Sequence, residues 1–219
     1  MIHQPAMSGG ETLLSTVRHG LTELNRDKRV GGLLDVPLIE KGRHQALQAR
    51  ESFDGTPFDV VVSSPLSRAL ETAEIITGVG REDIVVEGGC IERSFGEMEG
   101  LTADQVRVRF PQVRYMRVGH INYSLNPPGG ETFEQLHERA KGFLDCLLKT
   151  HGGKRILLFA HENSLQQLHG VMHGLDPMES LHQRILNCEL NQFHLDATGS
   201  LVFHNRIELC PSAVEYPSF

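Results

Sequence analysis

The chain has 219 residues, of which 39% are hydrophobic and 22% are charged, a balance typical of a soluble globular protein with one domain. Its net charge of −7 argues against a general nucleic-acid-binding surface, and no apolar run approaches the ~18–20 residues of a membrane-spanning helix. Residues 1–11 lack the basic-then-apolar build of a signal peptide. We therefore expect a short disordered lead-in there, a single domain over residues 12–219 and a cytoplasmic location.

Strands and helices are expected to alternate along most of the chain. In chain order we expect a strand at 13–17, a helix at 39–52, a strand at 58–62, a helix at 66–77, a strand at 84–86, a helix at 131–149, a strand at 156–160, a helix at 163–173, and two alternating runs at 189–195 and 200–206. The first four strands are short and apolar, as strands buried on both faces are. The helices carry apolar residues on one face.

This alternation of strands and helices predicts an α/β fold. We expect a three-layer α/β/α sandwich with a mostly parallel central sheet. The last two runs are separated by residues 196–199, a turn sequence of Asp, Ala, Thr and Gly. They predict a hairpin, which places one antiparallel strand near the C-terminus.

Residues 102–130 are harder to assign. Four arginines are interleaved with apolar residues between 106 and 117, Pro111 interrupts any long helix, and residues 127–130 read as a loop. We expect this segment to be an insert that covers the substrate. Its arginines are expected mainly on a solvated face, with Arg114 and Arg117 as candidate contacts to a substrate.

No metal or cofactor is expected. The cysteines form no C-x-x-C pair, so reduced thiols are the default and a cysteine zinc site is not expected. His169 and His173 are spaced as two ligands on one helix face can be. His161-Glu162 begins like a zinc-protease motif, but Leu165 stands where that motif needs its second histidine.

Basic residues follow three of the expected strands. Arg18 and His19 end the first strand, Arg68 lies near the start of the helix after the second, and His161 ends the strand at 156–160. The C-terminal ends of parallel strands lie on one edge of a sheet, so we expect these side chains to converge. Two arginines and two histidines around one point form a pocket for a tetrahedral dianion.

Four ordered motifs resemble those of the histidine phosphatase superfamily, also called phosphoglycerate-mutase-like. They are Arg18-His19-Gly20-x-Thr22-x-x-Asn25, Ser63-Ser64-Pro65-Leu66-x-Arg68-Ala69-x-x-Thr72-Ala73, Glu92-x-x-Phe95-Gly96-x-x-Glu99-Gly100 and the strand that ends at His161. The loop 32–38, Gly42-x-x-Gln45-Ala46 and Gly130-Glu131-Thr132 also match. The resemblance covers roughly residues 12–206, and the compact segment between Glu92 and His161 is similar to the phosphatase branch.

The resemblance implies a role for each matched residue. His19 is the nucleophile that becomes phosphorylated, and Glu92 is the acid/base. The phosphoryl group is bound by Arg18, Arg68 and His161, with Asn25 as a further donor and Gly32 in the matched substrate loop. The chemistry is consistent, because nearby arginines keep an imidazole neutral and a bound phosphate raises the pKa of a neighbouring carboxyl group.

Three positions depart from the family pattern. Leu21 replaces the usual glutamate of the first motif, Leu33 replaces the usual aromatic residue of its loop, and Glu162 replaces the usual glycine after the last histidine. Two orientations of Glu162 are open. Its side chain either enters the pocket as a substrate-binding group, or points away as a helix-start acid that the helix dipole favours.

The sequence thus predicts a metal-independent phosphomonoesterase that acts on a small phosphorylated metabolite through a phosphohistidine on His19. A phosphoglycerate-type mutase is the first alternative, with Arg114 and Arg117 reading a carboxylate. A phosphate-binding module without turnover is the second. The pattern does not identify the metabolite, no nucleic-acid or membrane partner is expected, and a homodimer is the default on base rates.

Overall fold

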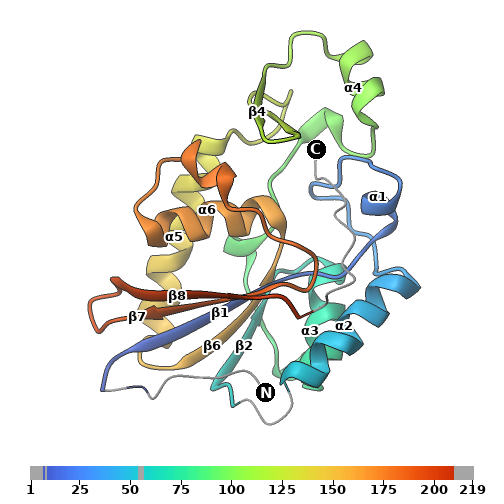
Figure 1. Cartoon of the computed structure of the whole chain (residues 1–219). Coiled ribbons are helices and arrows are strands. Elements are labelled where there is room, and N and C mark those ends of the chain that lie inside the picture. The colour runs from blue at the N-terminus through green and yellow to red at the C-terminus, as the bar shows by residue number, and fades with distance from the viewer. Residues whose placement is uncertain (1–6, 8, 54–56, 210–219) are drawn as a thin grey trace.

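A computed structural model describes residue 7, residues 9–53 and residues 57–209, so most of the lead-in expected at 1–11 lies outside the described residues, as do residues 210–219. The strands are β1 (Thr12–Arg18), β2 (Val60–Ser63), β3 (Val85–Val86), β4 (Tyr115–Val118), β5 (Ile121–Ser124), β6 (Arg155–Ala160), β7 (Leu190–Leu195) and β8 (Leu201–Ile207). The α-helices are α1 (Glu23–Arg26), α2 (Glu40–Phe53), α3 (Ser67–Thr77), α4 (Ala103–Arg109), α5 (Phe133–His151) and α6 (Glu162–His173) (Figure 1).

A six-stranded sheet forms the centre of the fold, in the order β3-β2-β6-β1-β7-β8 (Figure 1). β1, β2, β3 and β6 pair in parallel, whereas β7 runs antiparallel to both β1 and β8. β8 therefore has the same direction as β1. The expected mostly parallel sheet with one antiparallel strand near the C-terminus is confirmed.

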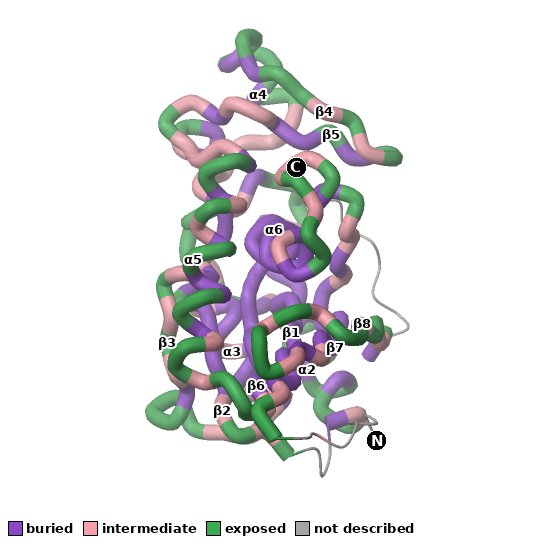
Figure 2. Tube along the Cα trace, turned by 90° about the vertical axis from the view of Figure 1, so that its left-hand side faces the viewer, coloured by how far each residue is buried: buried purple, intermediate pink, exposed green. Residues whose placement is uncertain are grey.

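Helices cover both faces of this sheet because its central strands are apolar on both faces. Along β6, Leu157 and Phe159 join an apolar cluster with α2 and α3, while Ile156 and Leu158 join a second cluster with α5 and α6. All four side chains are fully buried. Figure 2 shows the central strands and α6 as the buried interior. The expected three-layer sandwich is confirmed.

Residues 102–130, for which the sequence indicated no regular element, contain α4 and an antiparallel hairpin of β4 and β5. α4 begins at a capping box formed by Thr102 and Gln105. The hairpin turns at Gly119, which has a φ of 59°, a conformation that glycine adopts readily in two-residue turns. Each strand has only four residues, which is too short for its alternation to stand out.

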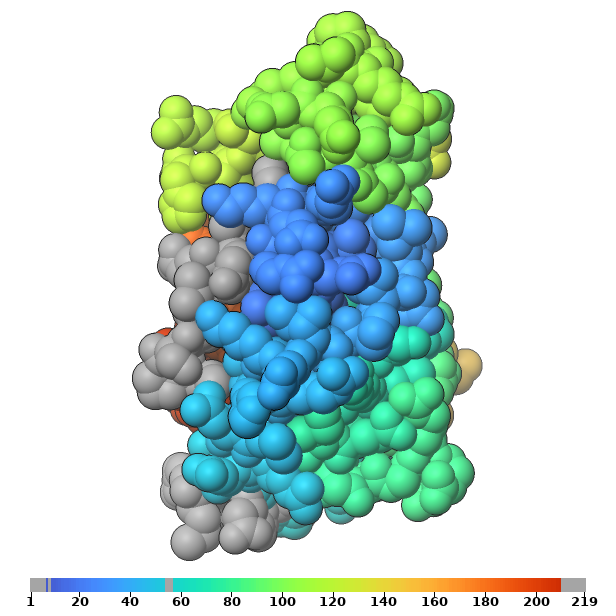
Figure 3. Space-filling view, turned by 90° about the vertical axis from the view of Figure 1, so that its right-hand side faces the viewer, coloured from blue at the N-terminus to red at the C-terminus, as the bar shows by residue number. Residues whose placement is uncertain are grey.

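The segment after α1 supports this insert. Val30 donates a backbone hydrogen bond to the Leu101 carbonyl at 2.9 Å and accepts one from the Gly100 amide at 2.8 Å. Its side chain packs with Phe95 and Val106 in a small core of their own. In Figure 3 the green atoms of the insert lie directly beside the blue atoms of the region that includes α1 and the segment after it. A largely apolar cavity of about 300 Å³ opens between α4 and the hairpin, lined by Val30, Met98, Ala103, Val106, Arg107, Tyr115, His120, Ile121, Asn122 and Ser124.

In the described ranges, no helix combines the length and the hydropathy that a membrane crossing requires. Over the same ranges, no group of three or more His, Cys, Asp or Glu side chains is arranged to hold a metal ion. His169 Nε2 lies 2.8 Å from the Thr16 hydroxyl, and His173 Nε2 lies 3.1 Å from Nδ1 of His204.

Candidate active site

The candidate site lies beyond the C-terminal ends of β1, β2 and β6. Arg18 is in register with Ala160, and the amide of His19 donates to the Ala160 carbonyl at 3.1 Å. β2 pairs with the other side of β6 and leads into α3, which carries Arg68 near its start. The rings of His19 and His161 consequently lie side by side, with centroids 5.1 Å apart.

Two glycines let the loop after β1 approach the start of α2. A Cβ atom on Gly20 would lie 2.7 Å from the Gly42 carbonyl oxygen, and a Cβ on Gly42 would lie 2.1 Å from that of Leu21. The amide of Leu21 also donates to Gln45 Oε1 at 3.0 Å, and that of Gly20 donates to Thr72 Oγ1 at 3.1 Å. Backbone contacts from α2 and side chains from α2 and α3 therefore hold the loop after β1 in place.

His19 is almost fully buried, with 4% of its surface exposed. Its Nδ1 lies 2.7 Å from the Gly20 carbonyl oxygen, and because a carbonyl only accepts, Nδ1 carries the proton. Nε2 therefore keeps its lone pair. Burial lowers the pKa of His19 well below 6.5, and the charges of Arg68 and Arg18 lower it further. Near neutral pH, His19 is a neutral imidazole with Nε2 available as a nucleophile.

Arg68 orients His161 and the loop above the pocket. Its Nε donates to Nδ1 of His161 at 3.2 Å, while Nη1 donates to the Leu34 carbonyl at 2.7 Å and Nη2 to the Gly32 carbonyl at 2.8 Å. Since Nδ1 of His161 accepts, its Nε2 carries the proton and donates to the Ser64 hydroxyl at 2.7 Å. Burial, followed by the charge of Arg68, lowers the pKa of His161 well below 6.5.

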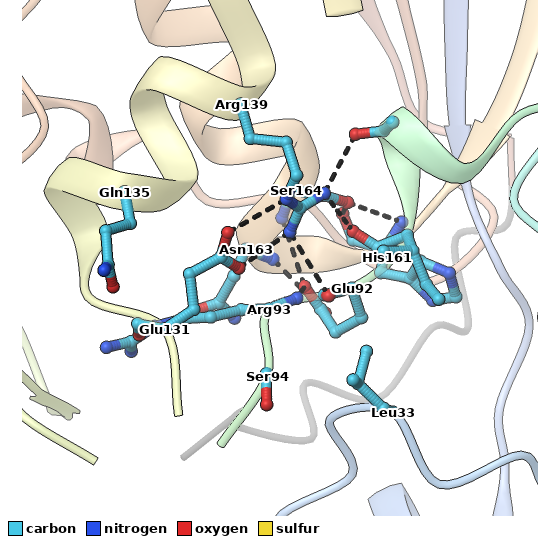
Figure 4. A network of polar contacts seen from close by, with 12 residues as sticks. Leu33, Glu92, Arg93, Ser94, Glu131, Gln135, Arg139, His161, Asn163 and Ser164 are labelled. Atoms are coloured by element: carbon cyan, nitrogen blue, oxygen red, sulfur yellow. Dashed lines mark hydrogen bonds and ion pairs between the residues drawn. The ribbon is translucent and has the colours of Figure 1, made fainter. Parts of the chain in front are cut away.

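Glu92 lies at the N-terminus of α6. Its Oε1 accepts from the amides of Arg93 at 2.8 Å and Ser164 at 3.1 Å, and its Oε2 accepts from the amide of Asn163 at 3.4 Å (Figure 4). Burial raises the pKa of Glu92, and the nearby Glu162 carboxylate adds to this rise, against the opposing effects of the amides and Arg68. A carboxyl group with a raised pKa suits general acid catalysis near neutral pH.

Arg139 of α5 fixes the loop that carries Glu92. Its Nη1 donates to the carbonyls of Gly89 and Ile91, both at 2.9 Å, and its Nη2 donates to the Glu92 carbonyl at 3.3 Å. The same guanidinium forms a bidentate ion pair with Glu131, with contacts of 2.9 and 2.8 Å (Figure 4). Arg139 thus contacts three backbone carbonyls of this loop and holds them in one geometry.

A small polar pocket of about 40 Å³ opens where these groups meet. It is lined by Arg18, His19, Thr22, Leu24, Asn25, Arg29, Gly31, Gly32, Arg68, Glu92, Phe95 and Asn163. Most residues expected from the sequence are therefore brought together, and His161 adjoins them through Arg68. Asn25 also lines the pocket. Its Oδ1 accepts hydrogen bonds from the Thr22 amide and hydroxyl.

Arg114 and Arg117 are not brought to this pocket. Both are exposed, and Nε of Arg117 donates to the Gly119 carbonyl at 3.0 Å. Neither lines the larger cavity of the insert. Their contact with a substrate stays a prediction.

Glu162 adopts neither of the two orientations considered from the sequence. It begins α6, as the helix-start alternative requires, but its side chain turns inward. Its Oε2 lies 2.7 Å from Nη1 of Arg18, with both side chains at least 96% buried. It does not line the pocket, but it contacts Arg18, which does. The buried position is possible because the guanidinium compensates the desolvated carboxylate.

Several site residues were not anticipated. Asn163, Arg29 and Phe95 line the pocket, and Ser64 and Ser164 bind His161 and Glu92. The position of Ser164 three residues after His161, where both form a capping box, is a readable signal. Arg139 offered none, because its partners are backbone carbonyls about fifty residues away.

Comparison with known proteins agrees with this geometry. A model of the histidine phosphatase superfamily (branch 1) matches residues 14–206. A 2,3-bisphosphoglycerate-dependent phosphoglycerate mutase of Parvibaculum lavamentivorans is 32% identical over 197 residues, which cover 87% of this chain and 93% of the mutase. An uncharacterized phosphatase of Bacillus subtilis, PhoE, is 32% identical over 180 residues, which cover 82% of this chain and 86% of that phosphatase.

The fold is shared with solved structures as well. A putative α-ribazole-5′-P phosphatase from Escherichia coli superposes with a TM-score of 0.79 at 21% identity, covering 91% of this chain and 98% of that one. With the family match spanning the sheet, the pocket and all four motifs, the chain belongs to branch 1 of the histidine phosphatase superfamily.

Proposed function

We propose that the protein is a metal-independent phosphomonoesterase that hydrolyses a small phosphorylated metabolite through a phosphohistidine on His19. The observation that carries this proposal is the state of His19: a buried, neutral imidazole whose Nδ1 is fixed by the Gly20 carbonyl. It lines one pocket with three guanidinium groups and a carboxyl group of raised pKa. These are the parts that phosphoryl transfer requires.

The reaction has two steps. In the first, Nε2 of His19 attacks phosphorus, the P–O bond to the leaving group breaks, and the leaving oxygen takes a proton from Glu92. In the second, water attacks phosphorus, Glu92 takes a proton from that water, and the P–N bond breaks to release inorganic phosphate. Arg18 and Arg68 stabilise the negative charge on the transferring group in both steps.

Trapping the phosphoenzyme tests this mechanism directly. Wild-type protein quenched with denaturant after mixing with labelled substrate should retain phosphate that acid removes and base does not, as for a phosphoramidate. His19→Ala should retain none and should not turn over. Label that survives acid, or label on His19→Ala, would refute the covalent step.

We also propose that the insert over residues 102–130 borders the leaving group. Val30 lines the apolar cavity of the insert, while its neighbours Arg29 and Gly31 line the polar pocket, so one chain segment separates the two. A panel of phosphorylated metabolites ranked by kcat/KM would identify the substrate class. Deleting the hairpin turn residues should change that ranking more than it changes p-nitrophenyl phosphate hydrolysis.

A mutase is the second candidate, because a phosphoglycerate mutase is among the relatives at 32% identity. Such an enzyme returns the phosphoryl group to another oxygen of its substrate. Arg114 and Arg117, the carboxylate readers that the sequence suggested, are exposed and do not line the pocket, which weighs against this candidate. Incubation with 3-phosphoglycerate and bisphosphoglycerate decides the matter: 2-phosphoglycerate appearing faster than free phosphate would overturn the phosphatase assignment.

A phosphate-binding module without turnover is the remaining alternative, and the complete set of nucleophile, cations and acid in one pocket weighs against it. Hydrolysis of p-nitrophenyl phosphate in the presence of EDTA, measured across pH, distinguishes the two. Release of p-nitrophenol supports a metal-independent phosphatase. Phosphate binding without release at any pH would favour the module.

A further inference from the structure

Arg18 is shared between the phosphate pocket and a buried carboxylate. The guanidinium lines the pocket, yet its Nη1 lies 2.7 Å from Oε2 of Glu162 and donates to the Ile185 carbonyl at 2.7 Å. The Arg18 side chain is 4% exposed and that of Glu162 is 2% exposed. An anion that enters the pocket therefore meets a guanidinium that already has a charged partner.

Arg18 is a direct counter-charge of Glu162. Glu162 is the first residue of α6, but the amides of the next two residues, Asn163 and Ser164, donate to Glu92. Tyr123 and Arg184 are also close: burial and the Glu162 carboxylate raise the pKa of Tyr123 to about 12, while Arg184 opposes that rise. A buried carboxylate is costly without a cation in contact, so the pair with Arg18 persists without a ligand.

The Glu162 carboxylate offsets part of the positive charge around the pocket. Three guanidinium groups, those of Arg18, Arg29 and Arg68, line the pocket, while burial lowers the pKa of both histidines well below 6.5 and raises the pKa of Glu92. Arg93 adds little, because it is buried beside Phe133, 3.7 Å from the ring centroid, and does not line the pocket. A phosphate dianion thus enters a positively charged site whose net charge the Glu162 carboxylate reduces.

We propose that Glu162 is a built-in counter-anion that sets how tightly the pocket holds phosphate. Fixed against Arg18, it offsets part of the attraction that the guanidinium exerts on a dianion. If the proposed function holds, on which this consequence rests, inorganic phosphate is the product, and the offset speeds its release. Burial raises the pKa of Glu92, and the charge of the same Glu162 carboxylate adds to that rise.

Equilibrium binding of inorganic phosphate tests the proposal without any turnover. Glu162→Gln keeps the shape and a hydrogen-bond acceptor for Arg18 but removes the charge. We expect it to bind phosphate roughly tenfold more tightly than wild type by isothermal titration calorimetry, as a unit charge at short range implies. Glu74→Gln is the control variant. It removes an equal charge from α3, where Glu74 forms a surface ion pair with Arg81, and it should bind phosphate as wild type does.

A pH profile separates a charge effect from a structural one. Removing the like charge of Glu162 should lower the pKa of Glu92, so the basic limb of kcat/KM for an alkyl phosphate should move to lower pH in Glu162→Gln. A purely structural role would lower kcat/KM at every pH without moving the limb. Phosphate inhibition should also be stronger in this variant.

Glu162→Ser, which removes both the charge and the contact, serves as a second variant and should also tighten phosphate binding. Folded variants that bind phosphate no more tightly than wild type would overturn the proposal. Failure of both variants to fold would make the pair structural and overturn it equally. Wild type that binds phosphate but hydrolyses no ester would instead refute the proposed function and leave the binding comparison intact.

Discussion

Nε of Arg68 donates to Nδ1 of His161 across 3.2 Å, and this one bond sets the tautomer of a histidine whose ring lies beside that of His19. The two remaining arms of Arg68 hold the carbonyls of Gly32 and Leu34. The guanidinium therefore orients a ring and a loop while it supplies charge to the pocket. Its contribution should not depend on the leaving group.

Arg68→Ala should slow the hydrolysis of an alkyl phosphate and of p-nitrophenyl phosphate by similar factors. Both reactions lose the same charge stabilisation of the phosphoryl group, an effect of about 10²–10³ in kcat for comparable preorganised donors. Steady-state kinetics with both substrates measures the two factors. A defect confined to the alkyl ester would show that Arg68 acts on the leaving group instead.

Glu92→Gln should show the opposite dependence. Glutamine keeps the shape of the side chain but donates no proton, so an alkyl phosphate with a basic leaving oxygen should lose ~10²–10⁴-fold in the phosphorylation rate. The p-nitrophenolate group needs little help to leave, so phosphorylation of His19 should be much less impaired with that substrate. Labelled phosphoenzyme should then accumulate, because water is no longer activated.

The contrast can be checked by single-turnover quench experiments. Equal slowing of His19 phosphorylation with both substrates would contradict the assignment of Glu92 as the acid. Glu162 would then be the next carboxylate to examine, given its position beside Arg18.

Arg139→Lys should reproduce part of the Glu92 defect. An ammonium group cannot maintain contacts with three carbonyls and the Glu131 carboxylate together, so the loop that carries the acid should shift. We expect kcat for an alkyl phosphate to fall about 10–100-fold, with KM and p-nitrophenyl phosphate hydrolysis changed less. Arg81→Lys, at an exposed pair with Glu74, is the matched control. Equal losses on both substrates would mean that Arg139 acts on stability alone.

Buried histidines should make the fold less stable in mild acid. Burial lowers the pKa of His19, His161 and His169 in the folded state, so below about pH 6.5 the unfolded chain binds protons that the folded chain does not. Their stabilising contribution is complete above that pH and is lost as the pH falls, by about 1.4 kcal/mol per pH unit for each proton. The pKa of Glu92 is raised, so its contribution to stability has the opposite dependence on pH. This one group is outweighed by the three histidines.

Thermal unfolding followed by circular dichroism at pH 7.5 and 5.5 measures this loss. The midpoint should fall on acidification, and it should fall less in His169→Gln, which removes a histidine outside the phosphate pocket. Identical shifts in wild type and variant would show that His169 does not contribute.

The contact between the nucleophile loop and α2 should tolerate no side chain. Gly42→Ala places a Cβ atom 2.1 Å from the Leu21 carbonyl oxygen, and because the neighbour is backbone, the loop must move. We expect unfolding free energy to fall by about 1–3 kcal/mol, together with a loss of activity. Gly142→Ala on the exposed face of α5 meets no atom within 4 Å and should stabilise by about 0.5–1 kcal/mol. Urea denaturation of both variants provides the measurement.

The sequence by itself determined the α/β architecture and the convergence of the basic side chains at one edge of the sheet. Apolar strands such as residues 156–160 fit only a sheet covered on both faces, and the ends of parallel strands share an edge. That geometry was sufficient to bring Arg18, His19, Arg68 and His161 together. The motif carrying Glu92 added the carboxyl group through family resemblance.

Short elements and side-chain directions were decided only by the tertiary structure. The hairpin of β4 and β5 has strands of four residues, and its turn at Gly119 carries the only strong local signal. The partner of Arg117 across the hairpin, Asn122, is set by the register of its strands. A periodic pattern too short to distinguish strand from helix cannot specify such a register.

Arg139 and Glu162 depended most on the folded chain. Arg139 acts on backbone carbonyls, which every residue has and which therefore leave no mark in the sequence. Glu162 could be placed at a helix start from sequence, but its inward turn depends on the guanidinium of Arg18, 144 positions away, being close enough to offset its desolvation. Local sequence sets where a carboxylate begins a helix, and only long-range packing decides which cation it meets.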